Sequence, residues 1–341
     1  MNNKLVSALL IFAVVLPACK DKKSVFDNVT GFTQGTTYSM VYENKQNINQ
    51  EDLKVKVENI LHEFDMSLST YNDSSIISRI NRNEVVMTDL YFTEVFAKSA
   101  LISEMTGGAF DITVGPLVRA WGFGPDEHKN FTEAKRDSLM KFVGMSKVSI
   151  KNGHVIKSDS GIFLDVNAIA PGYSVDVICG FFDSLNIKNY LVEIGGEVRG
   201  KGTRAGALWR IGIDKPVDNN MSPGQTLQAI AKISGKALAT SGNYRKFYVE
   251  DGIKYSHEID PKTGYPAKNT LLSVSILADD CAMADGIATA CMVMGKEKTI
   301  QFLGSHPEFS AYLIYSDENG NFQTWISPKF ADSVSETEGE K

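Results

Sequence analysis

The chain has 341 residues, with 41 acidic and 35 basic side chains and a formal net charge of −6. No stripe of Lys and Arg interrupts this acidic balance, which argues against a nucleic-acid partner. The length suits one large domain or two closely packed ones. Helical and strand patterns are mixed along the chain without an internal repeat, so we expect an α+β fold with mixed sheets and packed helices.

Residues 1–18 have the pattern of a signal peptide. Lys4 gives a positive start, the short apolar run LVSALLIFAVV follows, and Pro17 and Ala18 precede Cys19. A Cys at this boundary is typical of a bacterial lipobox, which predicts lipidation of Cys19; an ordinary secretory signal is the alternative. We expect residues 19–30 to tether an exported domain that faces the periplasm and is anchored by lipid in the inner or the outer membrane. No later run is apolar over the ~18 residues that a membrane span needs.

Three segments have the spacing of amphipathic helices. The first is Glu51–Phe64, and the second is Thr93–Thr106, which ends at a Gly-Gly pair typical of a helix C-cap. The third is Tyr173–Phe182, opened by Pro and Gly. All three lie before residue 185, in a chain whose helical and strand patterns are otherwise mixed.

Strand patterns dominate the second half. Trp209–Asp214 alternates apolar and polar residues, as a half-buried strand does. Phe247–Glu250 and Ile253–Ser256 flank Asp-Gly, the signature of a two-residue hairpin turn. Leu271–Leu277 reads as a further strand, after which Asp279-Asp280 predicts the cap of a helix that stops at Gly295.

The cysteines and the C-terminal tail carry less information. Cys179, Cys281 and Cys291 each lie in apolar helical sequence and are odd in number, so we expect small core residues and neither a disulfide framework nor a zinc site. Residues 331–341 are polar and acidic, which predicts a disordered tail after a domain spanning 31–330.

Asp285 and Thr289 form the most informative pair in the chain. They are four residues apart and share one helical face with Ala and Gly neighbours. A carboxylate on such a face is costly to bury unless it is paired or bound to a metal. Carboxylate, hydroxyl and carbonyl oxygens suit Mg²⁺. The alternative is a solvated Asp beside a Thr that bonds its own helix.

Three loops could hold a ligand. In residues 164–176 a strand leads through small residues into a helix start, which suits an anion but is also a plain connection. In residues 107–117 glycines permit close approach, and Trp121 and Phe123 could wall a planar ligand, although aromatics are more often core. Residues 69–75 read as a polar loop with Asp73 or Ser74 capping a helix.

His257 and Asp260 lie three apart before the tight turn Asp-Pro-Lys-Thr-Gly. A His with a nearby carboxylate can act as a base or orient a substrate, while a surface His without a role is the alternative. The chain lacks a Walker A motif, G-x-G-x-x-G, G-x-S-x-G and H-E-x-x-H, so kinase, Rossmann, hydrolase and zincin readings lose their usual support.

Taken together and in order, these segments resemble the FAD:protein FMN transferase family, the ApbE-type flavin transferase lipoproteins. The resemblance runs from about Gly35 to about Trp325. It is carried by the stretches MSLSTYNDSSIISRIN, GGAFDITVGPLVRAWGFGP, LDVNAIAPGYSVD, YLVEIGGEVRGKG, ATSGNYRKF, YSHEIDPKTGYP and ADGIATA.

The resemblance implies a T-fold-like α+β architecture and a reaction in which FMN passes from FAD to a Ser or Thr hydroxyl of a target protein, with Mg²⁺ present and AMP released. The residues it implies for FAD are Met40, Tyr71, Ala109, Phe110, Asp111, Asp165, Pro171 and Ile259. For Mg²⁺ it implies Asp285, Thr289 and the carbonyls of Ala168 and Ala288; His257 is the expected base, with Asp260 orienting it. Pro171 and Ala288 depart from the residues common in the family, Lys or Glu at the first and Asp in some members at the second.

Two alternatives stay open at this point. With water in place of the target hydroxyl the same site would hydrolyse FAD to FMN and AMP, although a bulky Tyr71 leaves less room for water. A non-catalytic, flavin-binding lipoprotein is the second. The family further implies acceptors among flavoprotein subunits of membrane redox complexes or secreted flavoproteins.

Overall fold

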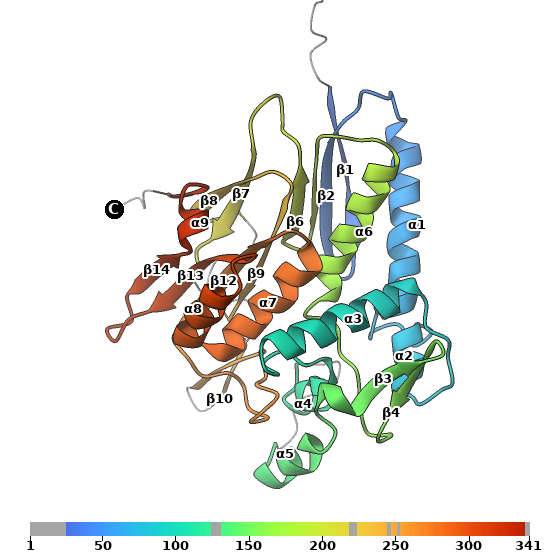
Figure 1. Ribbon diagram of the computed structural model, residues 1–341, viewed down its shortest axis with the longest axis vertical. Helices are drawn as coiled ribbons and strands as arrows, with labels where there is room; N and C mark the ends of the chain where they lie inside the picture. Colours follow the sequence, from blue (N-terminus) through green and yellow to red (C-terminus); the bar gives the residue numbers. More distant parts are fainter. Residues whose placement is uncertain (1–24, 124–130, 218–223, 244–246, 251–252, 338–341) are drawn as a thin grey trace, which may run out of the picture.

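The computed structural model describes residues 25–123, 131–217, 224–243, 247–250 and 253–337. An eight-stranded sheet runs through the molecule, and every pairing in it is antiparallel (Figure 1). In spatial order its strands are β1 (Phe26–Thr33), β2 (Thr36–Glu43), β5 (Tyr190–Ile194), β6 (Glu197–Lys201), β9 (Lys236–Gly242), β12 (Leu271–Ala278), β13 (Ser310–Ser316) and β14 (Phe322–Ile326).

The two faces of this sheet are covered differently. On β13, Ala311 and Leu313 point into the core beneath the helices, while the alternate Tyr312 and Ile314 point to the opposite side. That opposite side packs against a three-stranded sheet. Its strands are β15 (Val334–Glu336), β8 (Leu227–Ile233) and β7 (Trp209–Asp214).

Helices cover the first face, with α1, α6 and α7 lying across the sheet (Figure 1). The helices with their bounds are α1 (Gln50–Leu68), α2 (Ile76–Asn81), α3 (Leu90–Met105), α4 (Gly115–Ala120), α5 (Glu133–Met140), α6 (Ala170–Ser184), α7 (Cys281–Met294), α8 (Lys296–Ser305) and α9 (Pro328–Ala331). The helix pair α6 and α7 is in close contact and, as shown below, carries part of the candidate site.

A smaller group of elements lies beyond α3 at one end of the molecule (Figure 1). It contains α2, α4, α5, the 3₁₀ turns η1 (Ile112–Val114) and η2 (Met145–Lys147), and the hairpin of β3 (Val148–Lys151) and β4 (His154–Lys157). A separate apolar cluster of Leu117, Trp121, Val143 and Ile259 holds this end to the loop that precedes β12.

The expected α+β class and main helices are confirmed, and the strand pairings of the large sheet are all antiparallel. The helix predicted to stop at Gly295 is α7, capped by Asp280, whose side chain accepts from the Met283 amide. The predicted hairpin is β10 (Phe247–Glu250) paired with β11 (Ile253–Ser256). The three cysteines are buried and free, as expected. Helix α6 starts three residues before the predicted helix, at Ala170, because Pro171 fits a first-turn position.

Three local predictions were wrong. The tether was expected to reach residue 30, but β1 begins at Phe26 and pairs with β2. The tail was expected to be disordered from residue 331, but Val334–Glu336 pairs with β8 through its backbone, which needs no large apolar side chain. Helix α2 is capped by Ser75, which accepts from the Ser78 amide, and not by Asp73 or Ser74.

The signal sequence and Cys19 lie outside the described residues, so these predictions are untested. Across the residues that are described, none of the helices combines the length and apolar character of a membrane span.

Candidate functional site

Helices α6 and α7 touch where the sequence places Asp285. The amide of Gly172, in the first turn of α6, donates a hydrogen bond to Asp285 Oδ2 at 3.0 Å. A Cβ on Gly172 would lie 2.4 Å from the Cys281 carbonyl oxygen and 2.8 Å from the Asp285 Cβ, so only glycine permits this approach. The helix start and the carboxylate are therefore held together, as an anion or metal site between them requires.

Asp285 is buried, and its environment does little to neutralise it. Burial raises its pKa to about 7, and the hydrogen bond from the Gly172 amide lowers the pKa only in part. Among the described residues no Lys, Arg or His forms an ion pair with this carboxylate. A bound cation would supply the missing charge.

The remaining expected metal ligands are oxygen donors near the same helices. Thr289 is half-buried, and its Oγ1 lies 3.2 Å from Ser241 Oγ on β9. Ala168 lies in the turn just before α6, and Ala288 is fully buried in α7. The described residues contain no cluster of three or more His, Cys, Asp or Glu side chains that could hold a metal. One carboxylate with hydroxyl and carbonyl oxygens fits Mg²⁺, which keeps waters and phosphate oxygens as its other ligands.

Ala109–Asp111 lies between α7 and the loop at residues 164–167. The Phe110 ring passes 3.5 Å from the position of a Cβ on Gly286 of α7, and the Asp165 amide donates to the Ile112 carbonyl at 2.7 Å. Asp111 caps the η1 turn, because Oδ1 accepts from the Thr113 amide and hydroxyl. Its Oδ2 accepts from the Met145 amide at 2.7 Å. The Asp111 carboxylate thus holds the loop together, and the expected contact of this loop with FAD stays a prediction.

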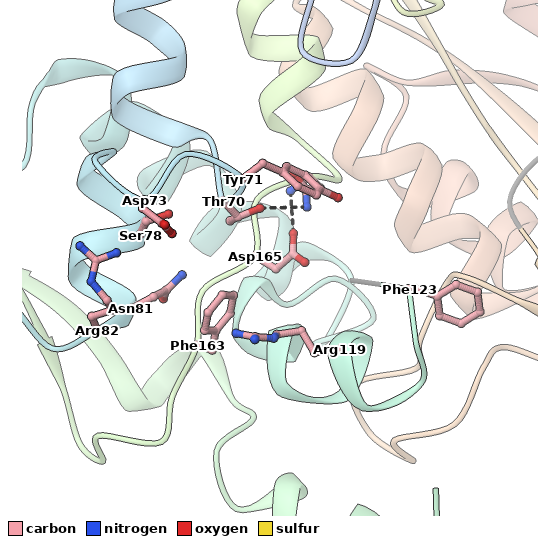
Figure 2. A pocket seen from close by; sticks show the side chains of 11 residues that line it. Thr70, Tyr71, Asp73, Ser78, Asn81, Arg82, Arg119, Phe123, Phe163 and Asp165 are labelled. Carbon is pink, nitrogen blue, oxygen red and sulfur yellow. Dashed lines mark hydrogen bonds between the residues drawn. The ribbon is translucent and has the colours of Figure 1, made fainter. Parts of the chain in front are cut away.

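A cavity of about 340 Å³ opens beside this loop (Figure 2). Tyr71 and Asp165, two residues expected to contact FAD, both line it. Asp165 Oδ1 accepts from the Asn167 amide at 2.9 Å, and Asn167 Nδ2 reaches Thr70 Oγ1 at 3.5 Å. The remaining lining residues are Asp73, Ser78, Asn81, Arg82, Arg119, Phe123 and Phe163.

Arg119 gives this cavity a cation. It projects from α4 and stacks over the Phe163 ring at 4.9 Å from the centroid (Figure 2). Asn81 fixes the opposite wall, because its side chain exchanges two hydrogen bonds with the Leu164 backbone, at 2.8 and 2.9 Å. The hollow is part-aromatic, and its two Arg side chains are balanced by Asp73 and Asp165, so it suits a planar ligand with polar groups.

His257 lies next to the cavity wall. The Phe123 ring that lines the cavity meets the His257 ring edge-on, at 6.3 Å between centroids. His257 Nδ1 lies 3.5 Å from Oε1 of Glu258, a carboxylate that is almost fully buried. Glu258 therefore stands where the sequence had suggested Asp260 as the partner of the His.

Asp260 has a different structural task. Its Oδ1 accepts from the Lys262 amide at 2.9 Å and its Oδ2 from the Thr263 hydroxyl at 3.1 Å, which closes the turn after Ile259. Ile259 is buried in the small cluster with Trp121 and bridges to Pro266. A catalytic role for Asp260 stays a prediction without support from these contacts.

Of the expected FAD residues, Tyr71 and Asp165 line this cavity; Ala109, Phe110, Asp111, Pro171 and Ile259 do not, and neither does Met40. Its side chain is fully buried on β2, in the cluster between the sheet and α1 and α6. Pro171, in contrast, lies on the first turn of α6 directly before Gly172, beside Asp285.

Comparison with known proteins settles what this arrangement belongs to. The model of the ApbE family matches residues 34–313. The chain belongs to the ApbE family. A FAD:protein FMN transferase from Haemophilus influenzae is 34% identical over 96% of this chain and 97% of its own length. Another from Vibrio cholerae is 34% identical over 97% of this chain and 98% of its own length.

Solved ApbE structures share the fold. The flavin transferase ApbE from Vibrio cholerae has a TM-score of 0.82 and 33% identity, covering 91% of this chain and 99% of that one. The apo flavinyl transferase ApbE from Pseudomonas stutzeri has a TM-score of 0.81 and 31% identity, covering 91% of this chain and 97% of that one. The expected ApbE-like architecture is confirmed.

For this ApbE chain, sequence reasoning missed Arg119, Asn81 and Glu258 as parts of the site. Arg119 on α4 and Asn81 on α2 line the same cavity, and no local sequence pattern predicts that they come together. Glu258 is adjacent to His257 in the chain, so this signal was available. Of the two aromatics considered as walls, Phe123 lines the cavity, while Trp121 is core and donates to the Gly264 carbonyl.

Proposed function

We propose that this protein is a FAD:protein FMN transferase that requires Mg²⁺, attaches FMN to a Ser or Thr hydroxyl of a target protein, and releases AMP. The observation that carries the proposal is the joining of two half-sites. One is the cavity of Tyr71, Asp165 and Arg119, and the other is the buried Asp285 at the start of α6. The segment Ala109–Ile112 links them, through the Phe110 ring beside α7 and the Ile112 carbonyl that accepts from the Asp165 amide.

In this proposal FAD occupies the cavity and extends toward α6. Tyr71 and Phe123 offer ring faces to the planar parts of the substrate, and Asp165 and Asn167 offer polar groups. Arg119 and the start of α6 lie where negative charge is favourable, because the first amides of a helix attract anions. Pro171 has no amide to give, and the amides of Gly172 and Tyr173 already bond Asp285 and the Ile169 carbonyl, so charge on the diphosphate would be met here mainly by the bound metal.

Mg²⁺ would be held by the Asp285 carboxylate, the Thr289 hydroxyl and the Ala168 carbonyl, with the Ala288 carbonyl as a further candidate. When bound, it neutralises charge on the diphosphate, which is what phosphoryl transfer needs most. Gly172 keeps Asp285 facing the helix start where the diphosphate would lie.

The reaction balances with one proton transfer. The target hydroxyl oxygen forms a bond to the phosphorus of the FMN half, and the bond from that phosphorus to the bridging oxygen breaks. AMP leaves with the electron pair. We assign the hydroxyl proton to His257, because its ring packs against Phe123 of the cavity wall and Glu258 lies beside its Nδ1.

The test is an incubation of the purified protein with FAD and Mg²⁺, with and without an acceptor flavoprotein. Protein-bound flavin and free AMP are measured. We expect equal amounts of both with acceptor and little AMP without it. Rapid AMP release without acceptor would show an FAD pyrophosphatase instead, and FAD binding without AMP would show a flavin-binding lipoprotein.

We also propose that the protein is exported and anchored by lipid on Cys19 in the bacterial cell envelope, facing the periplasm. Support comes from the signal-like residues 1–18 and the Cys at their end. Acceptors would then be flavoprotein subunits of membrane redox complexes or secreted flavoproteins. Metabolic labelling with a palmitate analogue should mark the wild type; a Cys19→Ala variant that is labelled equally would contradict the anchor.

A further inference from the structure

The contact between α6 and α7 repeats over two helical turns. On α6, Gly172 and Asp176 are four residues apart, and on α7, Cys281 and Asp285 are four apart. The two residues of each pair therefore lie one helical turn apart, and the two pairs face each other across the contact between the helices. The α6 backbone at Gly172 bonds the α7 side chain Asp285, and the α6 side chain Asp176 bonds the α7 backbone at Cys281. The two hydrogen bonds thus hold the same pair of helices from opposite directions.

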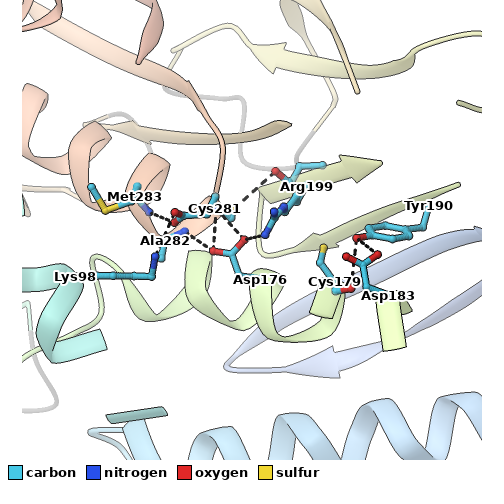
Figure 3. Close-up of polar contacts among 11 residues, drawn as sticks. Lys98, Asp176, Cys179, Asp183, Tyr190, Arg199, Cys281, Ala282 and Met283 are labelled. Atoms are coloured by element: carbon cyan, nitrogen blue, oxygen red, sulfur yellow. Dashed lines mark hydrogen bonds and ion pairs between the residues drawn. The ribbon is translucent and has the colours of Figure 1, made fainter. Parts of the chain in front are cut away.

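Asp176 gathers donors from two other elements (Figure 3). Its two oxygens accept from the Cys281 amide at 3.0 and 2.9 Å, and Oδ2 also accepts from the Ala282 amide at 2.9 Å. Both amides belong to the first turn of α7, where no helix carbonyl is available to them. Arg199 on β6 donates to Asp176 Oδ1 from Nη1 at 2.6 Å and neutralises it. The side chain of Asp176 is 10% exposed, so these three donors are its environment.

A third contact secures the same end of α7. Lys98 on α3 pairs with Asp280, the N-cap of α7, at 3.2 Å. The first turn of α7 is thereby fixed from α3, α6 and β6 at once. Asp285 lies one turn further along, packed against Gly172 with no spare room. Any shift of the α7 start moves Asp285 relative to the α6 start by a comparable distance.

We propose that Asp176 is a positioning residue for the metal half of the site: through the first-turn amides of α7 it sets where Asp285 and Thr289 face the start of α6. This inference rests on the proposed function, because it assumes that those two residues bind Mg²⁺. Asp176 itself touches neither substrate nor metal. Changes to such supporting residues typically cost ~10–100-fold in metal affinity.

The test uses Mn²⁺ as a spectroscopic probe of the site. Mn²⁺ is titrated into the protein with FAD present, and free Mn²⁺ is followed by electron paramagnetic resonance. Asp176→Asn keeps the shape but turns an NH₂ group toward donors, so we expect the Kd for Mn²⁺ to rise at least ~10-fold. FAD affinity in EDTA, from quenching of flavin fluorescence, should change less than about twofold.

Asp183→Asn is the matched control. Asp183 is also on α6 and also pairs with a cation of β6, Lys201 at 2.8 Å, but its second side-chain partner is Tyr190 on β5 and not the start of α7 (Figure 3). This control should leave the Kd for Mn²⁺ unchanged. If Asp176→Asn does not fold, Arg199→Lys tests the same role, because it changes only the donor that β6 gives to Asp176. This variant should weaken Mn²⁺ binding without weakening FAD binding in EDTA.

The outcomes separate the two claims. If Asp285→Ala keeps wild-type Mn²⁺ binding, the proposed metal site is wrong. If Asp285→Ala abolishes it while Asp176→Asn leaves it unchanged, only the positioning role is wrong. If Asp176→Asn loses FAD in EDTA to the same extent as Mn²⁺, Asp176 supports the fold in general and the positioning role is likewise overturned.

Discussion

At the scale of single residues, Asp285 is a carboxylate buried against a helix start with one neutral hydrogen bond, from Gly172. Its pKa is raised from 3.8 to about 7, with burial as the main cause. Between about pH 4 and pH 7 the folded protein therefore holds a proton on Asp285 that the unfolded chain has released. The contribution of this proton to the free energy of unfolding is complete below about pH 4 and is lost as the pH rises through about 7.

We predict that Asp285→Asn raises the free energy of unfolding of the metal-free protein at about pH 8, by at most ~4 kcal/mol for this pKa displacement. The amide keeps an acceptor for Gly172 and carries no charge. Urea unfolding in EDTA checks this, with the gain shrinking toward pH 4. A variant less stable than wild type at pH 8 would contradict the account of Asp285.

His257 is the proposed general base of the transfer reaction. We predict that His257→Ala lowers the rate of FMN transfer ~10²–10⁴-fold, as loss of a general base does, while FAD binding is kept. Single-turnover transfer with FAD bound measures this. Asp260→Asn is the companion variant: because Asp260 holds a turn, it should lower stability more than rate. Wild-type transfer by His257→Ala would remove His257 from the mechanism.

At the scale of elements, local signals predicted α7 because an Asp suited to the N-cap and a Gly suited to the C-cap, Asp280 and Gly295, stand at its two ends. They did not predict the cap of α2, where several cap-forming residues stand in a row and only Ser75 is oriented to bond Ser78. Nor could they show that α2 and α4 meet at the cavity, since Asn81 and Arg119 are brought together by tertiary packing alone.

We predict that Gly172→Ala separates α6 from α7, because its Cβ would lie 2.4 Å from a backbone oxygen that cannot move freely. The free energy of unfolding should fall by ~1–3 kcal/mol, the usual cost of overpacking, and Mn²⁺ binding should weaken. Gly180→Ala is the control on the same helix: its Cβ meets nothing within 4 Å, so it should be neutral or stabilising by up to ~1 kcal/mol. Equal behaviour of the two variants would refute a tight α6–α7 contact.

At the scale of the whole molecule, the central sheet separates the site from the C-terminal strand. The helices that carry Asp285 cover one face, while β15 extends the small sheet on the other. Glu336 on β15 accepts from the Tyr312 hydroxyl at 2.6 Å and from Thr324 at 2.8 Å. The polar composition of this tail misled the prediction, because edge pairing relies on backbone bonds that composition does not report.

We predict that truncation after Ser333 lowers the melting temperature but leaves the Kd for FAD unchanged, because the lost contacts lie across the sheet from the site. Differential scanning fluorimetry and flavin fluorescence measure the two quantities. Truncation after Thr337 keeps β15 and is the control, with no expected change. A melting temperature unaffected by the longer deletion would show that β15 contributes nothing to the fold.

The central claim is group transfer to a protein, and the ratio of covalently bound FMN to released AMP measures it most directly. Intact-mass spectrometry of an acceptor flavoprotein gives the first quantity, and chromatography of the same reaction gives the second. With FAD and Mg²⁺ the account predicts a ratio close to one, and no product with Asp285→Ala. AMP in large excess over bound FMN, or an unmodified acceptor beside consumed FAD, would contradict it.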